Sequence, residues 1–334
     1  MRDYYRPLVR RDDPRPETAL PLAGGRGWFA HCARHRRDGS VTRVPARDVP
    51  QDILARLTAP RLPLAGLALD RTRIMGILNV TPDSFSDGGL DDGPAAAVAR
   101  AARLVADGAE ILDVGGESTR PGALAVSEAD EIARTAPVIA DLGGVPISID
   151  TRKRRVAEAA VAAGAAIVND VAGLTFDPGL ADFVAEAGLP VCVMHSRGDP
   201  ATMQDDPRYD DVLLDVYDFL EERVEMLESK GLPRDRIIVD PGIGFGKTQA
   251  HNLALLNGLA LFHGLGCAIL LGASRKGFIG RIGAEPEPAK RASGSVAVAL
   301  AGLAQGIQII RVHDVAETRQ AFALWHAIED GAGR

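Results

Sequence analysis

Polar and ionisable side chains follow apolar runs at eight places along the chain. Their amides and carboxylates can exchange hydrogen bonds with a substrate, and their cations can hold an anion. They are Asn79, residues 117–120, Asp150, Asn169, His195, Asp240, residues 274–276, and Arg311 with His313. A single Asp after a strand is often a helix cap, and Asp150 or Asp170 fits that role. Capping does not account for the lysine, arginine and histidines, so the set predicts one functional site.

The elements that must position these side chains alternate between apolar runs of strand length and stretches rich in Ala, Leu and Glu at helical spacing. The candidate strands are 73–80, 110–115, 146–150, 166–171, 190–195, 236–240, 268–273 and 307–312. The candidate helices include 95–107, 127–142, 153–163, 211–230, 251–262 and 289–305. This alternation predicts an α/β fold, a TIM (β/α)8 barrel whose strands all end on one face. Periodicity alone does not separate it from an open doubly wound sheet.

The N-terminal part of the chain differs from the rest in charge and pattern. Residues 1–70 hold 13 arginines and eight acidic residues, a charge of +5, whereas the remainder carries −12. We interpret residues 1–61 as an N-terminal extension with some strand character at 27–33, and residues 62–334 as the barrel domain. Residues 62–70 are expected to form a short hairpin that closes the base of the barrel.

Composition excludes several classes of protein. The extension's arginines are interleaved with acidic residues, which does not indicate a nucleic-acid partner. The apolar run 296–304 is far short of the roughly 18 residues of a membrane helix, so no membrane partner is expected. The three cysteines form no C-x-x-C pair, and the charged N-terminus does not resemble a signal peptide. A cytoplasmic location is the expectation.

Two glycine-rich stretches and one histidine are the candidates for a cofactor or metal site in this sequence. Residues 240–248 look like a phosphate-binding loop, but position 241 is Pro where that motif needs Gly. Gly115-Gly116 lacks the spacing of a dinucleotide site. His195 has no partner at zinc-ligand spacing, so a zinc site is not indicated.

Long segments of the chain resemble the signatures of dihydropteroate synthases. Residues 74–89 (IMGILNVTPDSFSDGG) resemble the first signature and residues 108–122 (GAEILDVGGESTRPG) the second. Residues 240–247, 274–276 and 311–314 match further family motifs in the same order. The resemblance covers about residues 62–330, and residues 1–60 have no counterpart in the family core.

The resemblance implies a reaction in folate biosynthesis. p-Aminobenzoate displaces pyrophosphate from 6-hydroxymethyl-7,8-dihydropterin pyrophosphate to give 7,8-dihydropteroate. The resemblance also implies Mg²⁺ accompanying the pyrophosphate, inhibition by sulfonamides, and a homodimer.

The resemblance assigns a role to each candidate residue. The pterin is expected to bind Asp150, Asn169, Met194, Asp240 and Lys276. The pyrophosphate is expected to bind Asn79, Thr119, Arg311 and His313, with Asn79 also a Mg²⁺ ligand. The p-aminobenzoate pocket is assigned to Thr119, Arg120, Pro121, Phe245, Ser274 and Arg275. The residues expected to carry the chemistry are Asp87, Lys276, Arg311 and His313.

Two other functions remain open at this point. One is a pterin-binding methyltransferase, which would share the barrel but would not need the Ser-Arg-Lys motif or the Arg311/His313 pair. The other is a non-catalytic paralogue that binds a pterin. Fold does not decide among them, and only turnover excludes the second.

Overall fold

Eight parallel strands close into a barrel in the computed structural model, which describes residues 2–81, 93–118, 125–198, 203 and 205–331. Around the barrel the strands follow one another in chain order. They are β6 (Arg73–Asn79), β7 (Ile111–Gly115), β8 (Ile147–Asp150), β9 (Ile167–Asp170), β10 (Val191–Met194), β11 (Ile237–Asp240), β12 (Ala268–Leu271) and β13 (Ile309–Val312). Since β13 pairs with β6, the sheet has no edge. The predicted TIM barrel is confirmed, and the open sheet is excluded.

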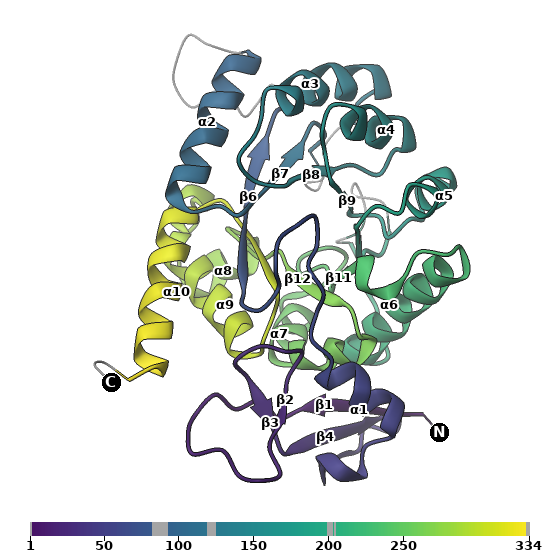
Figure 1. The fold of residues 1–334 in the computed structure, drawn as a ribbon, viewed down its shortest axis with the longest axis vertical. Coiled ribbons are helices and arrows are strands. Elements are labelled where there is room, and N and C mark those ends of the chain that lie inside the picture. The colour runs from purple at the N-terminus through teal and green to yellow at the C-terminus, as the bar shows by residue number, and fades with distance from the viewer. Residues whose placement is uncertain (1, 82–92, 119–124, 199–202, 204, 332–334) are drawn as a thin grey trace.

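Helices cover the outside of the barrel (Figure 1). They are α2 (Pro94–Asp107), α3 (Glu128–Ala140), α4 (Arg154–Ala162), α5 (Pro178–Glu186), α6 (Val212–Ser229), α7 (Gln249–Asn257), α8 (Gly277–Ile282), α9 (Ala292–Ala304) and α10 (Val315–Glu329). The strands are buried on both faces, which explains their continuous apolar runs. One predicted helix was too long: α7 ends before Gly258, and η4 (Leu259–Leu265) is a separate 3-10 helix. None of the helices in the described ranges is long and apolar enough to cross a bilayer.

A short hairpin closes the N-terminal end of the barrel, as predicted. Leu64 and Leu67 form an antiparallel bridge, and Leu64 and Leu69 are almost fully buried. They pack against the inward-facing residues of the lowest strand layers, including Met75 and Ile309. Because this end is filled by apolar side chains, we expect a polar ligand to bind at the opposite end, where the strands terminate.

Residues 2–61 fold into a small module, which we call the N-terminal module. Its main sheet is antiparallel and contains β1 (Asp3–Pro7), β4 (His31–Arg36) and β5 (Val41–Pro45). A second pair of strands, β2 (Leu20–Pro21) and β3 (Trp28–Phe29), and two helices, η1 (Ala46–Asp48) and α1 (Gln51–Thr58), complete it. It has its own core around Phe29, Cys32 and Leu57. The sequence indicated only the strand character at 27–33, because the other strands are short and interrupted by arginine.

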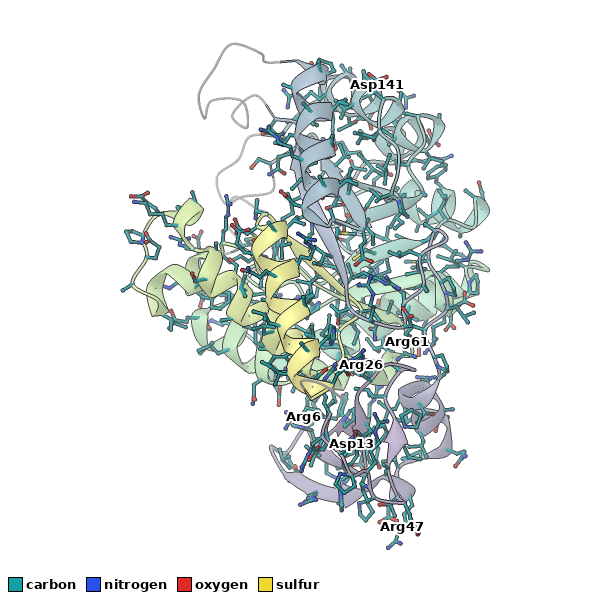
Figure 2. All side chains as sticks on the ribbon, turned by 60° about the vertical axis from the view of Figure 1, so that its left-hand side comes forward. Arg6, Asp13, Arg26, Arg47, Arg61 and Asp141 are labelled. Atoms are coloured by element: carbon teal, nitrogen blue, oxygen red, sulfur yellow. The ribbon has the colours of Figure 1, made fainter. Side chains whose placement is uncertain are left out.

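The module sits against the base of the barrel, at the lower edge of Figure 1. Tyr4 meets Tyr217 of α6 edge to face, with ring centroids 5.5 Å apart, and donates a 2.8 Å hydrogen bond to Asp218. Arg37 pairs with Asp215 and Asp218. In Figure 2, Arg6, Arg26 and Arg61 lie near the junction, whereas Arg47 lies at the module's far end. The positive charge of the extension therefore meets the negative charge of the barrel.

Candidate active site

The strand ends bring the predicted side chains together inside the barrel mouth. In the strand register, Asn79 is opposite Gly115, Gly115 opposite Asp150, and Asp150 opposite Asn169. Met194 is opposite Asp240 in the same way. Residues in one register row of parallel strands point to the same side of the sheet. These predicted residues from five strands therefore share one cavity wall.

Arg311 joins three of the strands from the centre of the site. Its Nε donates to Asp113 Oδ2 at 2.5 Å, and its Nη2 donates to Asp150 Oδ2 at 2.7 Å. Asn169 Nδ2 donates to the same Asp113 oxygen at 3.1 Å. Burial works against the charged guanidinium, but the carboxylates outweigh it and raise the pKa of Arg311. The result is a buried network in which one guanidinium links two carboxylates and one of these also accepts from Asn169.

The two carboxylates of this network are Asp150 and Asp113. Burial raises the pKa of Asp150 to about 7, against the lowering effect of Arg311, and the charge of Asp113 adds to the rise. Asp113 was missed as a site residue. The sequence does place an acidic residue inside the otherwise apolar run of β7. A buried carboxylate is costly without a polar or charged partner, so this position could have been recognised as part of a polar site.

Asp240 ends β11, and Lys276 follows β12 at the start of α8. Asp240 is buried, which raises its pKa, and its Oδ1 accepts the Gly242 N–H at 2.7 Å. Lys276 Nζ donates to the Ile243 carbonyl and lies 4.1 Å from the centre of the Phe245 ring. Burial lowers the pKa of Lys276 to about 7, although the negative charge of Asp240 opposes this. A hydrogen-bond acceptor, Asp240, and a lysine whose charge changes near pH 7 therefore face the same cavity.

Gly272 has no side chain to fill the space between Asp240 and Arg311. A Cβ atom there would lie 3.5 Å from Asp240 Oδ2 and 3.9 Å from Arg311 Cδ. Gly115 serves in the same way on the other side, where a Cβ would lie 3.7 Å from Asp150 Oδ2 and 3.8 Å from Asn79 Oδ1. Both glycines keep the polar groups accessible from within the barrel.

His195 is held by a buried lysine that the sequence did not single out. Lys247 Nζ lies 2.8 Å from His195 Nδ1 and donates to the carbonyls of His195 and Phe245. Burial, together with the charge of Lys247, lowers the pKa of His195 to about 2. His195 is therefore neutral, and the pair fastens the loop after β11 to the end of β10.

The ends of β12 and β13 are joined by polar contacts. Ser274 Oγ accepts the His313 backbone N–H at 3.2 Å and lies 3.0 Å from His313 Nδ1. Arg275 has φ 58° and pairs with Asp314, which holds this left-handed residue in place. Residues assigned by the resemblance to the pyrophosphate and p-aminobenzoate sites are thus neighbours.

Four predicted site residues, Asp87, Thr119, Arg120 and Pro121, lie outside the described residues. The chain on either side of residues 119–124 is firmly held. Glu117 accepts the Val126 backbone N–H at 3.0 Å and pairs with Arg152 at 3.2 Å and Lys153 at 3.3 Å.

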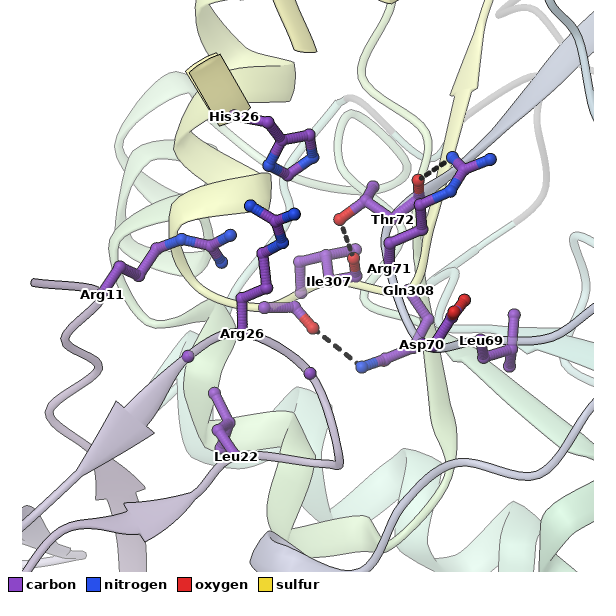
Figure 3. A pocket seen from close by; sticks show the side chains of 13 residues that line it. Arg11, Leu22, Arg26, Leu69, Asp70, Arg71, Thr72, Ile307, Gln308 and His326 are labelled. Atoms are coloured by element: carbon purple, nitrogen blue, oxygen red, sulfur yellow. Dashed lines mark hydrogen bonds between the residues drawn. The ribbon is translucent and has the colours of Figure 1, made fainter. Parts of the chain in front are cut away.

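A hollow between the N-terminal module and the barrel is a different place (Figure 3). Three arginines line it, but each pairs with a carboxylate: Arg11 with Glu329, Arg26 with Asp330 and Arg71 with Glu110. It adjoins the starts of the strands, not their ends, and its charges are already neutralised. The strand-end site is therefore the candidate active site.

Comparisons with known proteins agree on one family. Residues 75–313 match the family model described as "Pterin binding enzyme". The chain is 46% identical over 264 residues to the dihydropteroate synthase of Escherichia coli strain K12, covering 78% of this chain and 93% of that one. It is similar to a Yersinia pestis dihydropteroate synthase with a sulfonamide drug complex (43% identity, TM-score 0.76, covering 80% of this chain and 98% of that one). It is also similar to a Xanthomonas albilineans dihydropteroate synthase in complex with 7,8-dihydropteroate (44% identity, TM-score 0.73, covering 79% and 96%).

Proposed function

The chain belongs to the pterin-binding enzymes and, among them, to the dihydropteroate synthases, and we propose that its strand-end site binds and joins the two substrates of that reaction. In folate synthesis this activity forms the bond between the pterin methylene carbon and the p-aminobenzoate nitrogen, with release of pyrophosphate. The observation that carries the proposal is the buried network of Asp150, Asn169 and Arg311, with Asp240 and Lys276 nearby.

The pterin is bound by the carboxylates and the amide. A pterin edge presents an amino group beside a ring N–H, and one carboxylate can accept both. Asp240 suits this role because Gly242 occupies Oδ1 with one hydrogen bond and Gly272 leaves open space near Oδ2. Asp150 and Asn169 contact the rest of the ring, Met194 packs against it, and Lys276 donates to its polar edge.

The pyrophosphate is bound beside the pterin by Arg311, His313 and Asn79. Cations and N–H donors there offset the negative charge that grows on the leaving group. Burial of the methylene carbon between these groups excludes water from the reacting centre. The amine of p-aminobenzoate then takes the place of the pyrophosphate oxygen and loses one proton.

Mg²⁺ fits this site as an ion shared with the substrate. Asn79 Oδ1 faces the space that a Cβ at position 115 would fill, and Mg²⁺ is often held by few protein oxygens together with phosphate oxygens and water. The described residues contain no group of three or more metal-binding side chains that would hold an ion alone. Bound there, Mg²⁺ would supply positive charge to the pyrophosphate.

The p-aminobenzoate pocket is assigned to Phe245, Ser274 and Arg275. The contacts among these loops support the assignment, since Lys276 stacks over Phe245 and Ser274 adjoins His313. Asp87 and residues 119–121 keep their predicted roles as proposals. The catalytic domain is assigned to residues 62–334.

A homodimer is proposed through α9 and α10. The helix α9 is apolar nearly all round, and α10 exposes Leu324 and Ile328, at 61% and 78%. A helix that is apolar on its outer face needs a partner, and a second copy of the chain is the partner that the family resemblance implies. A cytoplasmic location is also proposed, in keeping with three buried free thiols.

A coupled pyrophosphate-release assay tests the proposal. Purified protein with the pterin pyrophosphate, p-aminobenzoate and Mg²⁺ should release pyrophosphate and form dihydropteroate. Lys276→Met should lose most of this activity, whereas Lys290→Met, a matched change at an exposed lysine that pairs with Glu287, should not. Methyl transfer without pyrophosphate release would favour the methyltransferase, and pterin binding without turnover the non-catalytic paralogue.

A further inference from the structure

We propose that Asp113 is a positioning residue that holds Arg311 by its Nε and so leaves Asp150 available to the pterin. The inference rests on the proposed function of the site. It assigns a role to a buried side chain that the proposed function leaves without one.

The first support is the way Asp113 uses its two oxygens. Asp113 is fully buried on β7, and Oδ2 accepts both the Arg311 Nε and the Asn169 amide. No residue in the described ranges donates to its Oδ1. Within the described residues, its side-chain hydrogen bonds therefore all use one oxygen and reach two side chains, both of which are assigned to the substrate site.

The second support is the division of Arg311 between two carboxylates. Its Nε faces Asp113 and its Nη2 faces Asp150. Asp150 is needed by the pterin, so its bond to Arg311 must break or be shared when the substrate arrives. Breaking a buried ion pair is costly when it leaves a charge alone. Here Arg311 stays paired with Asp113, so Asp150 can exchange partners at a lower cost.

Asp113 also fixes the orientation of Asn169. The Asn169 side-chain amide donates one N–H to Asp113 Oδ2, so its oxygen must point away from Asp113. The pterin therefore meets a preset pattern of donor and acceptor. Without Asp113 the amide could turn over, and the ligand would have to select one orientation.

The substitution Asp113→Asn tests the inference because it keeps the shape and removes the charge. Among the described residues Arg311 then keeps a salt bridge to Asp150 alone, and the pterin must compete with the guanidinium for that carboxylate. We expect calorimetry with 6-hydroxymethylpterin to show binding weakened by about tenfold, which corresponds to about 1.4 kcal/mol. Asp170→Asn is the matched control: Asp170 is equally buried but accepts only backbone N–H groups of its own turn, at Ala172 and Leu174. Its pterin affinity should stay at the wild-type value.

A double-mutant cycle shows whether Asp113 acts through Arg311. In an Arg311→Gln background, Asp113→Asn should change pterin affinity by less than about twofold, because the competing guanidinium is gone and the new side-chain amide keeps an oxygen that can accept the Asn169 N–H. An equal loss in both backgrounds would overturn the inference, as would wild-type affinity in the folded single variant. If wild-type protein binds no pterin at all, the proposed function fails first, which distinguishes the two failures.

A measurement on the wild-type protein covers the case in which Asp113→Asn does not fold. In protein labelled with ¹⁵N-arginine, the Arg311 Nε–H signal, assigned by its absence in Arg311→Gln, should exchange slowly with water. It should remain slow after saturation with 6-hydroxymethylpterin, since the bond to Asp113 persists. Rapid exchange in the complex would mean that Arg311 leaves Asp113, and the inference would be wrong.

Discussion

Tyr4→Ala tests whether the N-terminal module is fastened to the barrel mainly for stability. Tyr4 is 3% exposed, lies edge-on against Tyr217, hydrogen-bonds to Asp218 and lies within 4.8 Å of the Arg2 guanidinium. Truncating a buried aromatic residue to alanine typically costs about 3–5 kcal/mol. The edge-to-face pair accounts for about 1 kcal/mol of this. Tyr4→Phe removes only the hydroxyl and should cost about 1 kcal/mol.

The two tryptophans of the chain allow the module and the barrel to be followed separately. Trp28 lies in the module and Trp325 in α10 of the barrel. Trp325→Phe leaves Trp28 to report on the module, and Trp28→Phe leaves Trp325 to report on the barrel. With a slope of about 3 kcal/mol per molar guanidinium, a loss of 3 kcal/mol moves the Trp28 transition by roughly 1 M.

Catalysis should be untouched by the same change. The module contacts the base of the barrel, whereas the site lies at the opposite strand ends. We expect kcat/KM of Tyr4→Ala to stay within about twofold of wild type at temperatures where the protein is folded. An unchanged Trp28 transition would refute the packing argument. Loss of turnover in the folded variant would mean that the module takes part in catalysis.

Three further predictions concern the site and the domains. Asp240→Asn should weaken pterin binding by about 2–4 kcal/mol, because an amide presents a donor to a donor; calorimetry with wild-type affinity in the folded variant would contradict the assigned role. Burial raises the pKa of Asp150 in the folded protein to about 7, whereas an unfolded Asp titrates at about pH 4. Between these two pH values the folded protein binds one more proton than the unfolded chain, so its stability falls as the pH rises. The unfolding free energy of wild type relative to Asp150→Asn should therefore fall between about pH 4 and 7, and a flat difference would show that burial does not perturb this carboxyl. Deleting residues 2–61 should lower thermal stability yet leave most of the turnover of residues 62–334, and a folded, inactive truncation would reveal a functional module.

The barrel and most of its mouth could be predicted from the sequence, because each depends on short-range pattern. Continuous apolar runs separated by helical stretches report strands buried on both faces. Polar residues at the ends of those runs mark the face where a ligand can bind. The hairpin at residues 62–70 followed from the same reasoning. The segment 251–262 was wrong at its end, since Gly258 interrupts α7 and propensity alone does not locate the change to a 3-10 helix.

The module was underestimated because its strands are stabilised by contacts that are distant in sequence. Short strands such as Asp3–Pro7 gain little from local propensity, and here Tyr4 finds its partners on α6, more than 200 residues along the chain. Arg37, directly after β4, gives no sign of a structural role in the sequence until the fold brings Asp215 and Asp218 next to it.

By itself, the sequence determined which strands form the barrel, their order along the chain, and which side chains end them. Only the tertiary structure decided which buried polar residues pair with each other. Arg311 pairs with Asp113, 198 residues away, and Lys247 with His195, 52 residues away. Periodicity reports whether a position is buried, which is a local property of an element. The partner of a buried charge depends on the strand register and on closure of the barrel, and these are set by all the strands together.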